Sequence, residues 1–414
     1  MLDITSVRAQ FPALQRTING QPVIYADNPG GTQVPRAVAD AISDYLLYRN
    51  ANDGGDFVTS QLTDETIREA RLAMADFLNA PSSDELLFGP NMTSLTFRVR
   101  HAIARTIKAG DEVVISTLDH DGNYTPWNTL DEHGAIIHKV KINIDDVTLD
   151  LTDLEQKLSP RTRLVALGHA SNAVGSINPV KQMVEMVRAL APNALIFIDA
   201  VQSAPHLPID VQALGCDMLA CSSYKFFGPH MGILWGRYDV LDQLQAYKVV
   251  PVKNVPPNKF ETGTNNHEGM AGVTAAVNYI ASLVPPTEGE SRRTHLHRAM
   301  SAICEYEQTL NRHLIRGLTA MPRLHFYGIR DIERLDERVP TVAVNLVGRR
   351  PQEVAKRLAA EGIFCWAGHY YAIQVMHALG LLPNGALRLG LAHYNTVEEV
   401  DRLVETLAGI TNNT

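Results

Sequence analysis

Short apolar runs that alternate with helical patterns constrain the fold of this chain more than any other feature. The runs are rich in Val, Ile and Leu and too short for helices, and they cover residues 111–116, 163–167, 194–198, 217–221 and 231–235. Continuous apolar runs of this kind suit strands of a sheet that is buried on both faces. Helical stretches such as Val180 to Leu190 lie between them. The alternation predicts an α/β fold with a mainly parallel sheet.

The pattern of helix and strand signals in the sequence changes after about Pro285. Residues 288–318 form a long charged stretch with helical periodicity, and strand and helix patterns alternate from there to residue 409. The Pro285-Pro286 pair is typical of a boundary between two structural units. We therefore predict a smaller α+β domain after it.

Composition limits the partners and the location of the protein. The 414 residues carry a net charge of −8, which argues against binding to nucleic acid or to anionic membranes. The first residues, MLDITSVRAQF, lack the apolar core of a secretory signal, and no run approaches the roughly 18 apolar residues needed to span a bilayer. We expect a cytoplasmic protein. The four cysteines have no metal-ligand spacing, so we expect reduced thiols and no metal site: Cys216, Cys221, Cys304 and Cys365.

An acid and an amine follow two successive predicted strands. IFIDAVQ places Asp199 at the carboxyl end of one strand, the edge where open α/β sheets bind ligands. The next strand runs into Ser222-Ser223-Tyr224-Lys225, where partial burial would lower the pKa of the lysine and make it nucleophilic. Alone, Asp199 could cap a helix and Lys225 could be a surface charge. Together they suit pyridoxal phosphate (PLP), whose ring nitrogen needs a carboxylate and whose aldehyde needs an amine.

The string SSYK at residues 222–225 also fits the S-x-x-K nucleophile motif of serine β-lactamases. Neither KTG nor SDN follows it in the chain, so this alternative rests on four residues alone.

The order of these motifs resembles the class V aminotransferase-fold PLP enzymes, in their cysteine desulfurase and selenocysteine lyase branch. The resemblance runs nearly end to end, from YADN at 25–28 to NTVEEVD at 395–401. It implies the type I PLP-dependent transferase fold, with a mainly parallel seven-stranded sheet in a large domain, residues 23–284. It also implies a small α+β domain made of residues 1–22 and 285–414.

The resemblance assigns the residues around the cofactor ring. Lys225 would be the Schiff-base lysine and Asp199 the partner of the pyridinium nitrogen. Gln202 would donate a hydrogen bond to the phenolic oxygen of the cofactor. His120, in LDHDGN, would stack on the ring and, with Lys225, belong to the catalytic residues. Asn172, in SNAVG, would lie beside the cofactor oxygen and the substrate.

The sequence also predicts a phosphate-binding site. FGPNMTS at 88–94 is a turn that opens a helix, so the backbone N–H groups near Met92 and the Thr93 hydroxyl suit a phosphate dianion. Ser222 and Tyr224 would add hydroxyl donors, although the family usually has histidine at the tyrosine position. Thr264, in FETGTN, resembles the residue that reaches the phosphate of the other subunit. This implies a homodimer with shared active sites.

Arg388, inside the apolar run ALRLGL, matches the arginine that binds the α-carboxylate of the substrate in the family. An internal salt bridge is the alternative, since an arginine in such a run must be paired. Asn28, Asn172 and Tyr371 complete the expected substrate residues.

A tyrosine stands where the desulfurases need a reactive cysteine. Aligning GHYYA at 368–372 with the family's loop puts Tyr371 at the position that attacks the substrate sulfur and carries a persulfide. Tyrosine cannot hold a persulfide, and we do not expect Cys365, six residues earlier, to replace the cysteine. Trp366 stands where the family has an arginine.

The expected activity is that of a PLP-dependent enzyme acting at Cα and Cβ of an amino acid. We expect a C–S or C–Se β-lyase without a persulfide, in which Lys225 moves the Cα proton. Transamination stays open, and so does epimerisation with Tyr371 or His369 as the second acid. A catalytically degenerate PLP-binding protein is the non-enzymatic alternative.

Overall fold

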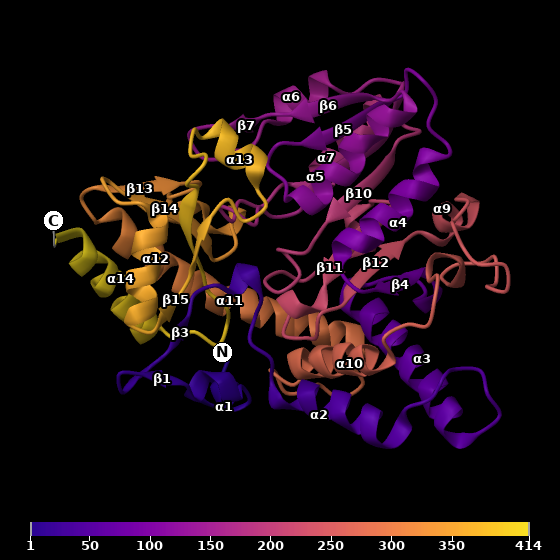
Figure 1. Ribbon diagram of the computed structural model, residues 1–414, viewed down its shortest axis with the longest axis horizontal. Coiled ribbons are helices and arrows are strands. Elements are labelled where there is room, and N and C mark those ends of the chain that lie inside the picture. The colour runs from indigo at the N-terminus through magenta and orange to yellow at the C-terminus, as the bar shows by residue number, and fades with distance from the viewer. Residues whose placement is uncertain (1, 413–414) are drawn as a thin grey trace.

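The protein, seen here as a computed structural model that describes residues 2–412, is built around two β-sheets (Figure 1). The larger sheet has seven strands in the order β4-β12-β11-β10-β9-β5-β6. Their bounds are β4 (Leu86–Gly89), β5 (Glu112–Ser116), β6 (Ile136–Val140), β9 (Thr162–Gly168), β10 (Leu195–Asp199), β11 (Met218–Ser222) and β12 (Gly232–Gly236). Strands β6, β5, β9, β10 and β11 run parallel, whereas β12 and β4 run antiparallel to their neighbours. The predicted α/β fold with a mainly parallel, seven-stranded sheet is confirmed.

The five apolar runs of the sequence form β5, β9, β10, β11 and β12, and the remaining two strands lie at the sheet edges. The edge strand β4 is only four residues long, and β6 mixes exposed and polar positions with apolar ones. The β4 run is apolar and buried throughout but too short to stand out, whereas β6 lacks the continuous apolar run of a strand covered on both faces. This is why the sequence pattern did not reveal them.

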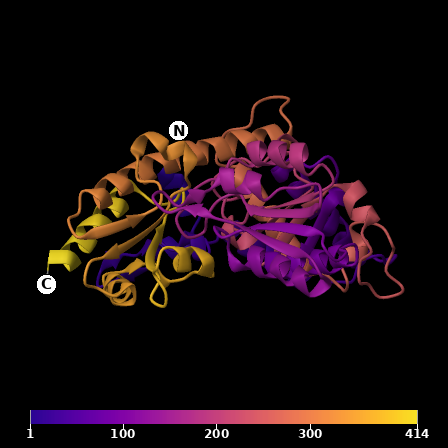
Figure 2. The same ribbon diagram turned by 90° about the horizontal axis from the view of Figure 1, so that it is seen from above.

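Helices cover both faces of the large sheet, as Figure 2 shows. One face packs on α3 (Val58–Leu78), α7 (Val180–Leu190), α10 (His267–Ala281) and the first half of α11 (Arg292–Thr319). The other face packs on α4 (Met92–Ala104) and α5 (Asp121–Asn128). Alternate residues of the central strands enter the two cores, as a period of two requires. Shorter helices lie around them: α1 (Ile4–Ala9), α2 (Arg36–Asp44), α6 (Leu151–Gln156), α8 (Val211–Leu214) and α9 (Tyr238–Gln243).

The smaller sheet has four strands in the order β13-β14-β17-β16. They are β13 (Leu324–Tyr327), β14 (Thr341–Leu346), β16 (Trp366–Gly368) and β17 (Ala386–Gly390). The second half of α11 packs on this sheet with α12 (Pro351–Ala360) and α14 (Val397–Asn412), and α13 (Ile373–Ala378) lies beside it. This arrangement follows the helix and strand patterns of the C-terminal sequence.

The chain crosses between the two sheets more than once. The long helix α11 begins beside α3, where the Arg292 Nε lies 2.5 Å from Asp76 Oδ2, and ends in the core of the small sheet. Near the N-terminus, β3 (Ile24–Tyr25) pairs with β15 (Ile363–Phe364) of the C-terminal part. The boundaries at 23 and 285 stay predictions, and residues 1 and 413–414 of the predicted small domain lie outside the described residues.

Candidate active site

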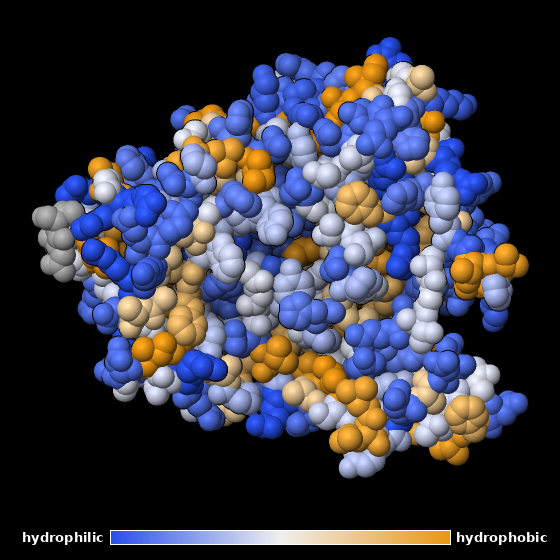
Figure 3. Space-filling view, in the orientation of Figure 1, coloured by the Kyte–Doolittle hydropathy of each residue, from blue (hydrophilic) through white to orange (hydrophobic). Residues whose placement is uncertain are grey.

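A cavity of about 780 Å³ opens at the carboxyl edge of the large sheet, where it faces the small sheet. Figure 3 shows the molecule hollowed near the middle of this face. Segments far apart in the chain form its wall: the loops after β5, β9, β10 and β11, the start of α4, the short turn η2 (Asn28–Gly30), the loop after β16 and strand β17. Most of the predicted site residues line it: Met92, Thr93, His120, Asn172, Asp199, Gln202, Ser222, Tyr224, Lys225, Tyr371 and Arg388.

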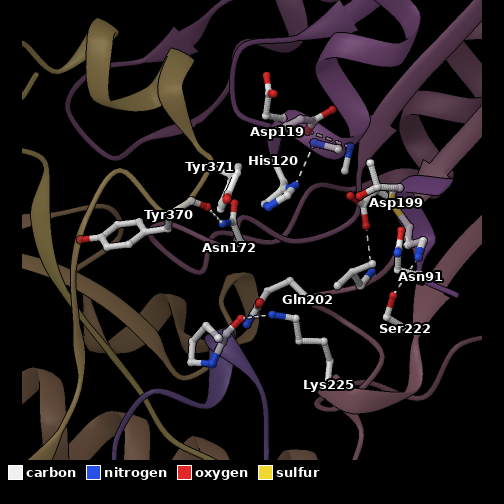
Figure 4. Close-up of a pocket in the computed structure, with 18 of the residues that line it drawn as sticks. Asn91, Asp119, His120, Asn172, Asp199, Gln202, Ser222, Lys225, Tyr370 and Tyr371 are labelled. Atoms are coloured by element: carbon white, nitrogen blue, oxygen red, sulfur yellow. Dashed lines mark hydrogen bonds between the residues drawn. The ribbon is translucent and has the colours of Figure 1, made fainter. Parts of the chain in front are cut away.

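Asp199 ends β10, so its side chain enters the cavity from the sheet edge (Figure 4). One carboxylate oxygen accepts a hydrogen bond from the Val201 N–H at 2.8 Å. Burial raises the pKa of Asp199 to about 6, because this bond and the charge of Lys225 only partly replace the lost water. A positively charged group in the cavity would therefore stabilise the carboxylate.

Lys225 enters the cavity from the 3₁₀ turn η6 (Ser223–Lys225), which follows the neighbouring strand β11. Its Nζ donates a hydrogen bond to the Pro29 carbonyl and lies 4.6 Å from the centre of the Tyr224 ring. Burial, with a further contribution from Arg388, lowers the pKa of Lys225 to about 7. A substantial fraction of this lysine is thus a neutral amine at physiological pH, as a nucleophile requires. The predicted acid and amine share one cavity.

His120 lies on the side of the cavity opposite Lys225, as Figure 4 shows. Its Nδ1 accepts the Gly122 N–H at 2.9 Å and caps α5, which fixes the imidazole. Burial lowers the pKa of His120 to about 4, and the positive charges of Lys225 and Arg388 act in the same direction. The imidazole is neutral, so it can pack flat against an aromatic ring without the cost of burying a charge.

Asp119, beside His120, was not among the predicted site residues. Its carboxylate accepts hydrogen bonds from the Gly168 N–H and from Asn123 Nδ2, both at 2.9 Å. Burial and the charge of Asp199 raise the pKa of Asp119 to about 8. These bonds join the loop after β5 to the end of β9 and hold the backbone on which His120 sits. The position of Asp119 next to His120 was the only sequence signal that could have placed it at the site.

The start of α4 forms one end of the cavity. Asn91 caps this helix by accepting the Ser94 N–H at 2.8 Å, and the Met92 N–H donates to Ser222 Oγ at 3.2 Å. A Cβ on Gly232 would lie 2.2 Å from the Asn91 carbonyl carbon, so glycine at this point of β12 lets the first turn of α4 rest on the sheet. A helix N-terminus with hydroxyl groups beside it suits an anion.

Arg388 reaches the other end of the cavity from β17. Its Nη2 donates to Asp27 Oδ1 and its Nη1 to the Asn172 carbonyl, each at 3.1 Å. Its guanidinium carbon lies 4.6 Å from the centre of the Tyr370 ring. The internal salt bridge that the sequence left open is therefore present, and its acid, Asp27, lines the cavity.

The loop after β16 adopts a strained conformation at the cavity. Tyr370 and Tyr371 have φ values of +50° and +59°, which non-glycine residues rarely adopt. Two bonds to the large-sheet part hold this turn: Asn172 Nδ2 donates to the Tyr370 carbonyl at 2.8 Å, and the Asp121 N–H donates to the Tyr371 carbonyl at 2.7 Å. The exposed ring of Tyr371 lies 5.5 Å from the His120 ring, centre to centre.

Two predicted residues lie outside the cavity wall. Asn28 is buried and its amide is fully used: Nδ2 donates to the Tyr25 and Gly390 carbonyls at 3.0 and 2.9 Å, while Oδ1 accepts from the Tyr394 hydroxyl. It fastens η2 to β17, while its neighbour Asp27 lines the cavity. Thr264 is exposed on the loop between α9 and α10, away from this cavity.

None of the four cysteines, all of which the structure describes, lines the cavity. Cys365 lies between β15 and β16 and packs against the core of the small sheet. Burial and the charge of Asp27 raise its pKa to about 12. Within residues 2–412, no three His, Cys, Asp or Glu side chains are grouped as metal ligands. Nor does any helix there combine the length and apolar character needed to cross a membrane.

The fold and the cavity define an α/β protein with a buried lysine and a buried acid at neighbouring strand ends. Residues 24–403 match the class-V aminotransferase family, and the chain belongs to it. It is 33% identical over 423 residues to a cysteine desulfurase of Serratia proteamaculans, covering 98% of each chain. A probable cysteine desulfurase of Mycolicibacterium paratuberculosis is 34% identical over 97% of this chain. The chain spans 57% of that relative and 66% of a similar protein of Mycobacterium leprae.

Solved structures agree with this family. A cysteine desulfurase from Thermococcus onnurineus, in its apo form, superimposes with a TM-score of 0.87 at 27% identity, covering 100% of this chain and 99% of that one. A cysteine desulfurase of Escherichia coli gives a TM-score of 0.82 at 25% identity, with 98% of each chain covered. The predicted membership of the class V aminotransferase family, with a cysteine desulfurase-like fold, is confirmed.

PLP is the cofactor that this family implies, and the residues of the cavity fit it. Asp199 is a buried carboxylate whose pKa is raised because its loss of water is only partly compensated. A protonated pyridine nitrogen would supply the missing positive charge. The amine of Lys225, the start of α4 and the flat neutral ring of His120 match the aldehyde, the phosphate and the ring face of the cofactor.

Proposed function

We propose that this protein is a PLP-dependent lyase that cleaves the C–S or C–Se bond of a cysteine-type amino acid without forming a persulfide on the enzyme. The observation that carries this proposal is the composition of the cavity wall. Tyr371 occupies the loop beside His120, and no cysteine of residues 2–412 lines the cavity.

The nearest alternative sulfur carrier is unsuited to the role. A thiol reacts as its thiolate, and the pKa of Cys365 is raised to about 12, so almost none of it is ionised at neutral pH. Its side chain is also turned into the small-sheet core rather than the cavity. In a lyase without an enzyme thiolate to attack the sulfur, the sulfur leaves the substrate as sulfide.

The cofactor would be held by the residues that line the large-sheet side of the cavity. Asp199 would face the ring nitrogen, Gln202 the phenolic oxygen and His120 the face of the ring. Gln202 is oriented by its bond to Thr341 Oγ1 at 3.2 Å. Four groups would bind the phosphate: the start of α4 at Met92 and the side chains of Thr93, Ser222 and Tyr224. When bound, PLP supplies an electron sink that makes the Cα–H bond of an amino acid acidic.

The chain's own residues then carry the substrate and the proton. Arg388 binds the α-carboxylate, assisted by Asn172, and Lys225 takes the proton from Cα. Loss of this proton drives the electrons of the Cα–H bond toward Cβ, the Cβ–S bond breaks, and sulfur leaves as hydrosulfide. Hydrolysis of the released enamine completes the balance: cysteine and water give pyruvate, ammonia and hydrogen sulfide.

A homodimer would complete the phosphate site through Thr264 of a second copy. Large hydrophobic side chains are exposed near this loop and near the start of α3, where Figure 3 shows orange atoms at the right and lower right. The most exposed of them are Leu47 at 70%, Tyr48 at 72%, Val58 at 70%, Tyr247 at 62% and Val250 at 93%. The loop is anchored at its base, because Glu261 accepts the Phe88 N–H at 2.8 Å and pairs with Arg71 at 2.6 Å. Surfaces of this kind favour association.

The products formed from L-cysteine test the proposal. We expect pyruvate, ammonia and sulfide in equal amounts, with no persulfide on any cysteine by mass spectrometry. Alanine with a protein persulfide would contradict the proposal and indicate a desulfurase. A keto acid formed only with an acceptor would indicate a transaminase, and racemisation without elimination an epimerase.

Tyr371→Cys provides a gain-of-function variant, with Tyr371→Ser as the matched control. We expect the cysteine variant to acquire a persulfide and to form some alanine, and the serine variant to do neither. In Lys225→Ala, borohydride should no longer fix PLP covalently, and turnover should be lost. Absence of PLP binding in the wild type would rule out the lyase, the transaminase and the epimerase together.

A further inference from the structure

The acid that pairs with Arg388 is itself part of the cavity. Asp27 Oδ1 lies 3.1 Å from Arg388 Nη2, and the Asp27 side chain is 28% exposed whereas that of Arg388 is 5% exposed. The pair thus has a buried cation and an anion that the cavity can reach. An incoming carboxylate that binds Arg388 must share the guanidinium with Asp27 or displace it.

The backbone holds Asp27 at this place. The Gly390 N–H donates to the Ala26 carbonyl at 2.8 Å, which joins the segment before η2 to the end of β17, two residues from Arg388. A Cβ on Gly30 would lie 2.4 Å from Asp27 Oδ2, so the glycine leaves room for the carboxylate to fold back over η2. The carboxylate is built into the site and is not a chance surface partner.

The end of the cavity near this pair also has unused polar atoms. Arg388 Nε and Asn172 Oδ1 are buried and lack a hydrogen-bond partner among residues 2–412. The first is a cationic donor and the second an acceptor. Buried polar atoms are nearly always paired, so a ligand with both an acceptor and a donor would complete this corner.

The amine end of the cavity lies beside the same turn. Lys225 Nζ donates to the carbonyl of Pro29, two residues after Asp27, and the charge of Asp27 acts on the ammonium of Lys225. A substrate amine that approaches Lys225 therefore comes close to the Asp27 carboxylate. The two charges of an amino acid would meet two opposite charges that are already paired with each other.

We propose that Asp27 binds the α-ammonium group of the incoming amino acid while Arg388 binds its α-carboxylate. The Asp27–Arg388 pair would open on binding, and each partner would regain an opposite charge from the zwitterion. A ligand with a carboxylate but no ammonium group releases Asp27 without a cation to replace Arg388, which costs binding energy. Asp27 thus selects zwitterionic α-amino acids over amine-free acids. This inference rests on the proposed function only in taking an amino acid as the substrate.

Ligand binding to the borohydride-reduced holoenzyme tests Asp27 without turnover. Reduction fixes the cofactor on Lys225, so L-alanine and propionate bind without reacting, and calorimetry gives both affinities. We expect the wild type to bind L-alanine at least about tenfold more tightly than propionate, as a charge-assisted contact to the ammonium group requires. Equal affinities, or tighter binding of propionate, would overturn the proposal without any variant.

Asp27→Asn removes the charge and keeps the shape. It should weaken L-alanine and strengthen propionate, so that the preference falls by at least about tenfold. An unchanged preference would overturn the proposal, and so would weaker propionate binding, which would mean that Asp27 only holds Arg388 in place.

Asp121→Asn is the matched control, because Asp121 lines the same cavity and its carboxylate accepts the Thr125 hydroxyl at 2.8 Å rather than Arg388. It should leave the preference unchanged, and an equal fall there would refute a local role for Asp27. Failure of borohydride to fix PLP on Lys225 would instead refute the proposed function, so the two failures are distinguishable.

Discussion

Replacing Lys225 by methionine is expected to stabilise the protein when PLP has been removed. Burial beside Arg388 lowers the pKa of Lys225 from 10.5 to about 7. At about 1.4 kcal/mol per pKa unit, holding the charged lysine in the fold costs about 5 kcal/mol. Methionine removes this cost but leaves the Pro29 carbonyl without its donor, a loss of about 1 kcal/mol. Water in the open cavity hydrates the charged lysine and makes its burial cost somewhat smaller. We therefore expect a net gain of about 2 to 4 kcal/mol in the free energy of unfolding.

The sign of the pH dependence follows from the lowered pKa. Below a pH of about 7 the lysine is charged in the folded and the unfolded state, so the variant shows its full advantage. As the pH rises from about 7 to 10.5, the folded state has released its proton while the unfolded state still holds it. The wild type gains stability over this range, and the advantage of methionine shrinks and then vanishes.

Denaturant unfolding of the PLP-free proteins at about pH 6 and about pH 9 measures both effects. Lys259→Met is the comparison variant, because Lys259 is also buried but its Nζ donates to the Asp242 carbonyl at 2.7 Å and lies 3.9 Å from the Asp242 carboxylate. Burial lowers the pKa of Lys259 as well, but the charge of Asp242 opposes this shift, so this variant should gain less than Lys225→Met. If Lys225→Met proves less stable than the wild type at about pH 6, or if its gain persists unchanged at about pH 9, the argument from a buried charged amine is wrong.

Gly175→Ala should lower the free energy of unfolding by about 2 to 4 kcal/mol, since φ is +82° and an added Cβ would lie 2.3 Å from the Thr341 carbonyl oxygen. Denaturant titration measures this loss, and a variant as stable as the wild type would refute the prediction. Arg388→Lys should raise KM for the amino acid at least about tenfold with PLP still bound, because an ammonium cannot form the two parallel bonds of a guanidinium. Steady-state kinetics measures the rise in KM, and PLP absorbance shows whether the cofactor is still bound. Asp199→Asn should lower kcat about 100-fold or more while borohydride still fixes PLP, since an amide stabilises a positive ring nitrogen poorly; an undiminished kcat would contradict this role.

Local sequence patterns were sufficient to place Asp199 and Lys225 at one edge of the large sheet. Asp199 and Lys225 each follow a strand whose apolar run is unbroken, so their position at the sheet edge follows from the strand ends alone. Helix α7 has the predicted bounds, Val180 to Leu190, because its apolar positions repeat with the period of a helix. His120 and Asn172 could be placed only through the order of the family motifs.

The substrate side of the site depends on contacts between distant segments, which local patterns do not contain. Asp27 and Arg388 are 361 positions apart in the chain. Which of Asp27 and Asn28 enters the cavity is decided by the docking of η2 on β17, and the sequence offered no sign of it. The left-handed backbone of Tyr370 and Tyr371 is likewise imposed by bonds to Asn172 and Asp121 from the other part of the molecule.

This division between the two sides explains why the sequence predicts a cofactor more firmly than a reaction. The groups proposed to hold PLP come mainly from loops at one edge of the large sheet, whose geometry the strands fix together. Apart from Asn172, the groups proposed to hold the substrate come from the residue before η2, the Tyr370–Tyr371 turn and β17, which meet that edge from the small-sheet side. A substitution at Tyr371 or Asp27 can therefore change which bond breaks, or which ligand enters, while the strand ends that bind the cofactor stay in place. Changes of reaction within such a fold should accordingly arise on the small-sheet side, where Tyr371 and Asp27 lie.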